Sequence, residues 1–157
     1  MTKRAWTDVD VHWLQAAIEL SRFCPPAIGA FSVGAIIVDR DGAEISRGYS
    51  REGDDPHLHA EAAALAKVDE EKRLLGGTIY SSLEPCSQRR HPVATCTQRI
   101  LSSGLSRVVI AWREPSLFVD DCQGFEMLTA AGLTVVEVPE LAEAARAINS
   151  HLGGISA

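Results

Sequence analysis

Three short segments of the chain carry side chains whose chemistry fits together. His59-Ala60-Glu61 lies at the start of a predicted helix, Cys86 follows a predicted strand, and Cys96 lies at the start of the next predicted helix. In an open α/β sheet the carboxyl ends of strands and the N-termini of helices meet at one edge, so we expect these residues to converge. One imidazole and two thiolates hold a tetrahedral Zn²⁺ with its fourth position open to water.

A zinc ion in such a site supplies a nucleophile for hydrolysis, because it lowers the pKa of its bound water to about 7. Glu61 is two residues from His59, so it lies near the metal without having to bind it. A carboxylate there can take the proton of the water and return it to a leaving group. The pattern predicts a hydrolytic zinc site with His59, Cys86 and Cys96 as ligands and Glu61 as the catalytic acid and base.

Each part of this pattern has a structural alternative. A single His-x-Glu pair also fits a capping histidine followed by a solvated acid in the first helical turn. Cys86 and Cys96 are separated by nine residues, which also fits two buried thiols. A purely structural zinc needs a fourth protein ligand, for which His91 and Cys122 are candidates. The catalytic interpretation is favoured because every element falls at a predicted strand end or helix start.

Length and composition indicate one domain over residues 1–157. Apolar residues make up 46% of the chain and charged residues 23%, which is typical of a globular protein and excludes a disordered or fibrous one. A chain of this length builds a core without disulfides, so its cysteines are expected as thiols or metal ligands. Cys24 and Cys122 are expected to be ordinary thiols.

Charge and hydropathy narrow the range of partners. The formal net charge is −6 and no Lys/Arg cluster forms a basic face, so no nucleic-acid partner is predicted. No run approaches the ~18 apolar residues of a membrane span, so no membrane partner is predicted. Residues 1–8 lack the apolar stretch of a secretory signal, which predicts a cytoplasmic protein.

The hydrophobic pattern alternates between strand and helix periods. Thr7 with Asp10 is typical of a helix N-cap, and Cys24-Pro25-Pro26 ends that first helix. Strands are predicted over 33–38, 43–49, 78–83, 108–112 and 133–138, and further helices over 59–68, 93–101, 125–131 and 139–152. A helical crossover makes the fourth and fifth strands parallel. This order predicts a three-layer α/β/α sandwich around a five-stranded mixed sheet.

The run Ser82-Leu83-Glu84-Pro85-Cys86-Ser87, with His59-Ala60-Glu61 before it and a long interval to Cys96, resembles the cytidine/deoxycytidylate deaminase superfamily. Within it, the chain is most similar to the deaminase domain of riboflavin biosynthesis, the diaminohydroxyphosphoribosylaminopyrimidine deaminase. The similarity continues through 33–38, 104–109 and 131–133. It implies a cytidine-deaminase-like fold, Zn²⁺ as cofactor on the same three ligands, Glu61 as proton shuttle, and a homodimer.

Departures from that family bear on the substrate. Ser32 stands where riboflavin-type deaminases usually have a substrate-contacting Asn. The loop after the first cysteine, usually rich in His, Gly and Thr, here reads Ser-Gln-Arg-Arg-His-Pro-Val-Ala-Thr over residues 87–95 and is one residue longer. His57-Leu58 is an insertion before the first ligand. These differences favour a small aminated N-heterocycle, a free nucleobase or a related pyrimidine, purine or triazine ring, over a ribosyl phosphate. The alternatives are the riboflavin-pathway substrate and, in another class, a non-catalytic binding module stapled by zinc.

Candidate substrate-binding residues lie beyond the fourth predicted strand and at Ser32. Trp112 and Phe118 can stack on a flat ring, and Glu114 can accept hydrogen bonds from ring N–H or amino groups. The alternative is that Trp112 is a core aromatic and Glu114 a solvated loop acid. Arg89 and Arg90 either reach a substrate phosphate or face the solvent.

Overall fold

A computed structural model of the protein describes residues 4–89, 93–117 and 122–152. Its sheet has the order β2-β1-β3-β4-β5. The strands are β1 Gly34–Val38, β2 Glu44–Tyr49, β3 Thr78–Ser81, β4 Arg107–Ile110 and β5 Thr134–Glu137. β1 is antiparallel to both β2 and β3, whereas β3, β4 and β5 are parallel to one another. The predicted mixed sheet with parallel fourth and fifth strands is confirmed.

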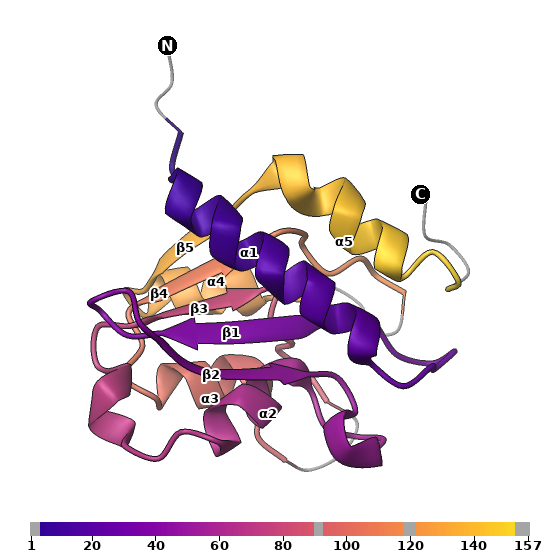
Figure 1. Cartoon of the computed structure of the whole chain (residues 1–157), viewed down its shortest axis with the longest axis horizontal. Coiled ribbons are helices and arrows are strands. Elements are labelled where there is room, and N and C mark those ends of the chain that lie inside the picture. Colours follow the sequence, from indigo (N-terminus) through magenta and orange to yellow (C-terminus); the bar gives the residue numbers. More distant parts are fainter. Residues whose placement is uncertain (1–3, 90–92, 118–121, 153–157) are drawn as a thin grey trace.

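Helices cover both faces of this sheet (Figure 1). One layer holds α1 Asp8–Leu20 and α5 Ala142–Ile148, and the other holds α2 Ala60–Ala66, α3 Cys96–Leu101 and α4 Gly124–Ala130. Short 3-10 segments lie at Ser21–Phe23, Glu52–Asp54, Glu71–Leu74 and Pro139–Leu141. The predicted α/β/α sandwich is therefore confirmed, and the apolar strand β1 lies fully buried between the two layers.

Helix α3 starts later than its apolar pattern predicts. Its first residue is Cys96 rather than Val93, because Thr95 is the N-cap. The Thr95 hydroxyl accepts a hydrogen bond from the Gln98 amide, and the Gln98 side chain accepts one from the Thr95 amide. This capping box places Cys96 in the first turn of the helix.

Asp10 joins the first helix to the sheet. Its carboxylate accepts two hydrogen bonds from Arg107 on β4, at 2.6 and 2.7 Å, and one from the Tyr80 hydroxyl on β3, at 2.9 Å. It also accepts a bond from the Thr7 amide and so closes the predicted capping box. Burial alone would raise the pKa of Asp10, but the bonds from Arg107, Thr7 and Tyr80 outweigh it and lower the pKa to about 2.

Replacing Asp10 by asparagine is expected to lower the free energy of unfolding by about 2–4 kcal/mol at pH 7, because Arg107 loses its buried partner. A carboxyl group with a depressed folded-state pKa stabilises above its unfolded pKa of about 4 and loses that effect as pH falls toward 2. The difference between the wild type and Asp10→Asn should shrink over that range in urea titrations. Asp8→Asn, an exposed change in the same helical turn, is the control.

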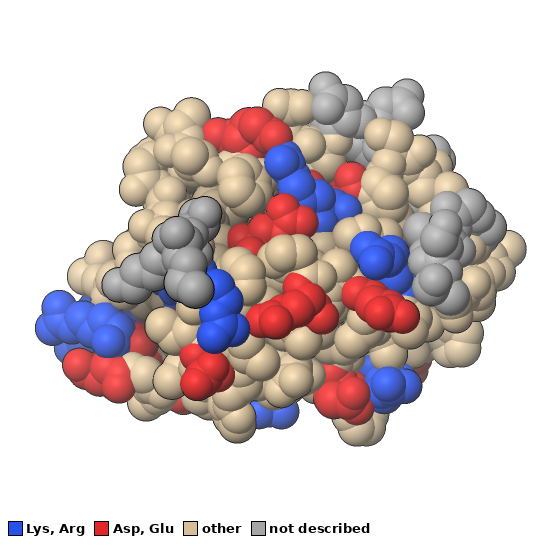
Figure 2. All heavy atoms as spheres, turned by 90° about the horizontal axis from the view of Figure 1, so that it is seen from above, with Lys and Arg blue, Asp and Glu red and all other residues tan. Residues whose placement is uncertain are grey.

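The face formed by α1 and α5 carries acidic and basic side chains in alternation, without a continuous basic region in this view (Figure 2). Among the described residues, no helix is long and apolar enough to cross a bilayer.

Candidate metal centre and active site

The three predicted ligands meet at the carboxyl end of β3. His59 is the N-cap of α2, Cys86 lies in the loop after β3, and Cys96 is the first residue of α3. The Nδ1 atom of His59 is 3.4 Å from the Cys86 sulfur and 3.5 Å from the Cys96 sulfur. One donor atom from each residue lies within 4.8 Å of the other two. The convergence expected from strand ends and helix starts is present.

Hydrogen bonds hold the Cys86 loop against the start of α3. The Thr97 amide donates to the Cys86 carbonyl at 3.1 Å, and the Thr97 hydroxyl donates to the Pro85 carbonyl at 3.2 Å. Helix α4 presses on the same loop at Gly124, where a Cβ would lie 2.2 Å from the Pro85 oxygen. Only glycine permits that approach, so three elements together fix the position of the Cys86 sulfur.

The Cys86 sulfur lies in surroundings that favour the thiolate. Hydrogen bonding from Cys96 lowers the pKa of Cys86, in opposition to burial, and the His59 ring lowers it further. The Cys96 amide donates to this sulfur at 3.3 Å. Two sulfurs and one imidazole nitrogen form the donor set that suits Zn²⁺, so the residues present fit that metal.

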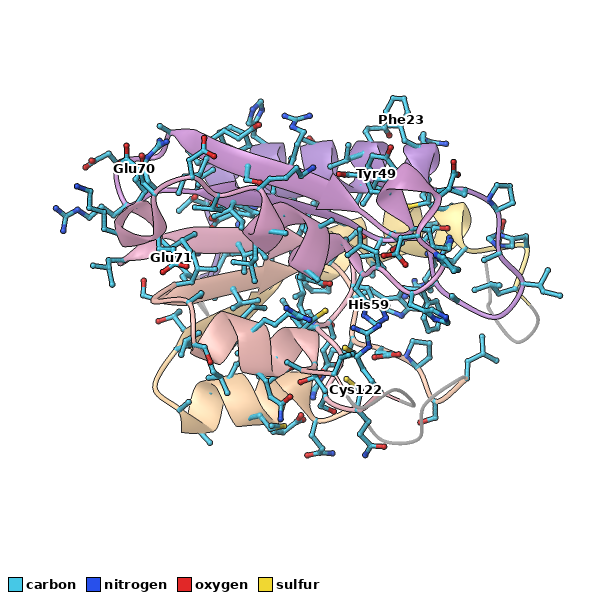
Figure 3. The ribbon with its side chains drawn as sticks, turned by 90° about the horizontal axis from the view of Figure 1, so that it is seen from below. Phe23, Tyr49, His59, Glu70, Glu71 and Cys122 are labelled. Carbon is cyan, nitrogen blue, oxygen red and sulfur yellow. The ribbon has the colours of Figure 1, made fainter. Side chains whose placement is uncertain are left out.

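Cys122, one of the two candidates for a fourth protein ligand, does not join this cluster. Cys122 is buried and its thiol donates to the Pro85 carbonyl at 3.5 Å, but it is not part of the donor group within the described residues. Seen from below, His59 and Cys122 lie toward the same end of the helical layer of α3 and α4 (Figure 3). His91 falls outside the described residues.

Glu61 is not the solvated acid of the structural alternative. It lies in the first turn of α2, is 4% exposed, and lines the same cavity as His59 and Cys86. The Ser81 hydroxyl donates to its Oε1 atom at 2.7 Å. Burial raises the pKa of Glu61, although the His59 ring and the Ser81 hydroxyl act in the opposite direction. The side chain is placed to exchange a proton with a molecule bound in the cavity.

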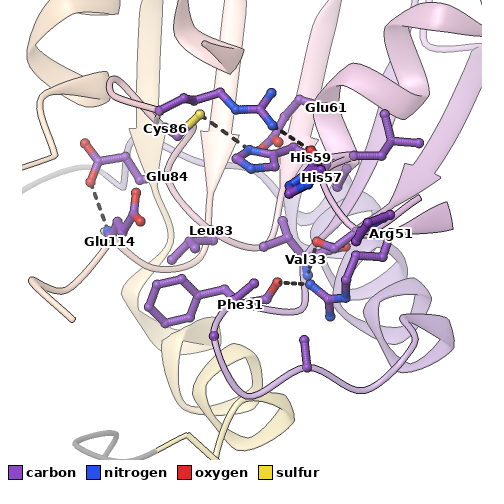
Figure 4. Close-up of a pocket in the computed structure, with 18 of the residues that line it drawn as sticks. Phe31, Val33, Arg51, His57, His59, Glu61, Leu83, Glu84, Cys86 and Glu114 are labelled. Carbon is purple, nitrogen blue, oxygen red and sulfur yellow. Dashed lines mark hydrogen bonds between the residues drawn. The ribbon is translucent and has the colours of Figure 1, made fainter. Parts of the chain in front are cut away.

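The cavity beside this cluster has a volume of about 700 Å³, within the range of small-molecule sites. Its wall is formed by residues from three segments, 26–33, 50–61 and 83–89, and by Glu114 from the loop after β4. Figure 4 shows Glu84 and Glu114 on one side of the cavity and Arg51 on the other. The site thus offers acidic groups near one wall and a cationic group near the opposite wall.

Two lining residues have roles that the sequence analysis did not predict. Glu84 is 3% exposed and accepts hydrogen bonds from the amides of Glu114, at 2.9 Å, and Phe125, at 2.8 Å. It thereby fixes the loop after β4 and the start of α4 beside the Cys86 loop. An acid directly before Pro85 in the sequence is the one signal that pointed to it.

Arg51 is the second of these residues. It has a left-handed φ of 59° and is 6% exposed, and its guanidinium donates to the Pro25 and Phe31 carbonyls and to the Ser32 hydroxyl. These three bonds hold the segment before β1 that forms one cavity wall. No local motif marks this arginine, because its acceptors lie 19 to 26 residues away.

The structure separates the predicted substrate-binding residues. Glu114 lines the cavity, and burial raises its pKa to about 7. Trp112 is not among the lining residues; it packs in the core, with its ring edge-to-face on Phe31 at 5.8 Å. Ser32 does not line this cavity either, and its hydroxyl accepts the Arg51 bond at 3.0 Å. Phe118 lies outside the described residues, and all four substrate contacts stay predictions.

Arg89 and Arg90 were the two candidates for contact with a substrate phosphate. Arg89 lines the cavity, and its guanidinium donates to the His57 carbonyl at 2.6 Å. His57 lines it as well, so the two-residue insertion before His59 contributes to the wall. Arg90 falls outside the described residues.

The fold and the site together define a class of protein: an α/β/α sandwich with a His/Cys/Cys cluster that fits Zn²⁺ and a buried glutamate in the same cavity. The family described as the cytidine and deoxycytidylate deaminase zinc-binding region matches residues 7–112. The chain belongs to this family, and the predicted resemblance is confirmed.

Individual relatives carry names from riboflavin biosynthesis. The chain is 38% identical over 128 residues to the diaminohydroxyphosphoribosylamino-pyrimidine deaminase of Schizosaccharomyces pombe. The aligned region is 80% of this chain and 31% of that protein. The riboflavin biosynthesis protein RibD of Aquifex aeolicus is 37% identical over 120 residues, which are 75% of this chain and 31% of that protein. The chain thus spans about a third of the length of these curated relatives.

Solved structures agree with this grouping. The Rib2 deaminase of Aspergillus oryzae, as a C-terminal deletion mutant, superposes with a TM-score of 0.80 and 26% identity, covering 92% of this chain and 93% of that one. The diaminohydroxyphosphoribosylaminopyrimidine deaminase/5-amino-6-(5-phosphoribosylamino)uracil reductase of Thermotoga maritima gives a TM-score of 0.76 and 27% identity, over 90% of this chain and 39% of that one. The predicted cytidine-deaminase-like fold is confirmed.

Proposed function

We propose that this protein is a zinc-dependent deaminase. Its substrate is an aminopyrimidine that carries a ribosyl phosphate, and the reaction removes an amino group from the ring by hydrolysis of the C–N bond. The observation that carries this proposal is the 38% identity over 80% of the chain with a diaminohydroxyphosphoribosylamino-pyrimidine deaminase. The relatives favour this substrate, the alternative of the sequence analysis, over the free nucleobase that the departures at Ser32 and residues 87–95 indicated.

The residues of the site account for the reaction. Bound Zn²⁺ would supply the nucleophile by lowering the pKa of a water molecule. The Glu61 carboxylate would accept a proton from the attacking water and pass it to the amino nitrogen of the substrate, which would leave as ammonia while the hydroxyl stays on the ring carbon. His59, Cys86 and Cys96 would hold the metal. The buried position of Glu61 limits the exchange of its proton with bulk water.

The dimensions and charges of the cavity support a substrate larger than a bare ring. A volume of about 700 Å³ leaves room beyond one heterocycle. Arg89 lines it together with His57, and a guanidinium group suits a phosphate. Glu114 also lines it, on the wall opposite Arg51, where it can pair with amino or ring N–H groups. These groups support a substrate that carries both a polar ring and an anionic substituent.

A substrate panel tests the proposal. Ammonia release by the zinc-loaded protein is measured with the diamino-hydroxy-pyrimidine ribosyl phosphate, the same pyrimidine without ribosyl phosphate, cytosine, guanine and an adenosine-containing RNA hairpin. We expect the highest kcat/KM with the ribosyl phosphate. A higher value with a free base would restore the free-nucleobase hypothesis, and no ammonia from any compound would favour a non-catalytic zinc-stapled module.

Replacing Glu114 by glutamine is expected to lower kcat/KM by about 5- to 150-fold, which corresponds to ~1–3 kcal/mol for polar partners left unpaired. The Glu114 carboxylate has two acceptor oxygens, whereas the glutamine side chain has one acceptor and one donor group. The metal content of the variant should not change. Glu126→Gln is the matched control, because Glu126 pairs with Arg113 at the surface and does not line the cavity. Equal kcat/KM in both variants would show that Glu114 does not bind the substrate.

Three further predictions belong to the same proposal. The homodimer implied by the family resemblance is checked by sedimentation equilibrium, the cytoplasmic location by cell fractionation, and the single domain over residues 1–157 by limited proteolysis.

A further inference from the structure

The last residue of β3, Ser81, lies behind the glutamate of the site. Its side chain has no exposed surface, and its Oγ atom is 2.7 Å from Glu61 Oε1 and 2.7 Å from the Leu83 carbonyl oxygen. Ser81 is neither a predicted metal ligand nor a lining residue of the cavity. Its two partners, a carboxyl oxygen and a carbonyl oxygen, can both accept its hydrogen.

A serine hydroxyl has a single hydrogen and two lone pairs, so it can donate to only one of these acceptors at a time. Whichever acceptor takes the hydrogen, the Ser81 Oγ atom lies 2.7 Å from both Glu61 Oε1 and the Leu83 carbonyl oxygen. The Leu83 contact fixes the hydroxyl at the end of β3, and the Glu61 contact ties the glutamate side chain to that fixed point.

We propose that Ser81 is a positioning residue that fixes the Glu61 carboxyl group beside the ligand cluster. This inference rests on the proposed function. The geometry carries it, because the strand end fixes Ser81 while Glu61 lies on a different element, helix α2. Ser81→Ala would remove the hydrogen bond to Glu61 Oε1, so the Glu61 side chain could adopt other rotamers.

The neighbouring residue provides a matched control. Ser82 is 3% exposed, and its hydroxyl accepts a hydrogen bond from the Gly34 amide at 3.1 Å. Ser82→Ala therefore removes a buried hydroxyl one residue away, and the bond that it breaks involves β1 instead of Glu61. Ser81→Thr is the rescue variant, because it restores a hydroxyl in a strand position where threonine is well tolerated.

Kinetics with the best substrate of the panel test the role. We expect Ser81→Ala to lower kcat by about 10- to 100-fold, the usual effect of losing a partner that orients a reacting group, with KM within about twofold of the wild type. Metal content should not change. Ser82→Ala should keep kcat within about threefold, and Ser81→Thr should regain most of the loss. An unchanged kcat in Ser81→Ala, or equal losses in Ser81→Ala and Ser82→Ala, would overturn the proposal.

Thermal unfolding tests the contact without any activity. The Tm is measured for Ser81→Ala, Glu61→Ala and the double variant. If the two side chains interact, the double variant is shifted by a different amount from the sum of the single shifts, whereas Ser82→Ala and Glu61→Ala should combine additively. Additive shifts for Ser81 and Glu61 would overturn the proposal. A wild type that releases no ammonia would instead refute the proposed function, so the two failures are distinguishable.

Discussion

Glu61→Ala is expected to lower turnover by at least ~10²-fold, the scale of a positioned acid and base, while the fold and the metal content stay as in the wild type. This buried carboxylate is the group that we expect to move a proton between water and the amino nitrogen, and alanine carries no such group. The fold should persist, because the hydroxyl that donates to Glu61 can donate to the Leu83 carbonyl instead.

Ammonia release under saturating substrate measures this effect, with elemental analysis of the same samples. Glu52→Ala is the matched control, since Glu52 carries the same charge, pairs with Lys67 at 2.7 Å and does not line the cavity. Near wild-type turnover in Glu61→Ala would mean that a different group carries the proton.

Removal of the metal is expected to abolish activity and to lower the Tm by about 10 °C. Binding at about 1,000 times the dissociation constant contributes ~4 kcal/mol, and each kcal/mol moves the Tm of a chain of this size by about 2–4 °C. Cys96→Ser should have the same two effects as chelation, because its sulfur is fully buried among the ligands.

Zinc analysis and differential scanning calorimetry, before and after treatment with a strong chelator, measure both effects. We expect about one zinc per chain in the wild type, as a three-ligand site holds one ion. Cys122→Ser is the control, because Cys122 is buried near the Pro85 carbonyl but lies outside the ligand cluster. Loss of zinc in Cys122→Ser would support a structural site with four protein ligands, and full activity in the zinc-free protein would contradict the metal-dependent mechanism.

Short-range patterns in the sequence predicted much of the fold. The capping box of Thr7 and Asp10, the apolar run of β1 and the helical crossover before β5 each depend on residues close together in the chain. The three predicted metal ligands were identified for the same reason, since each lies near an element boundary that a local pattern indicates. The edge at which parallel strands and helix starts meet then brings them together.

Other features depend on packing between distant segments. Glu84 binds amides 30 and 41 residues further along the chain, and Arg51 binds acceptors 19 to 26 residues before it. No periodicity encodes such partners, because they follow from how four segments close around one cavity. Trp112 has the residue type of a stacking platform, but β4 turns its ring into the core against Phe31.

By itself, then, the sequence determined the layered fold, the mixed sheet with its parallel fourth and fifth strands, and the convergence of His59, Cys86 and Cys96 with Glu61 beside them. The full strand order came from the tertiary structure. Only the tertiary structure decided which neighbouring side chains face the cavity. The physical reason is that a ligand at a helix start is placed by its own element. The orientation of Glu114, Arg51 or Ser81 depends instead on hydrogen bonds and packing with residues from several other elements.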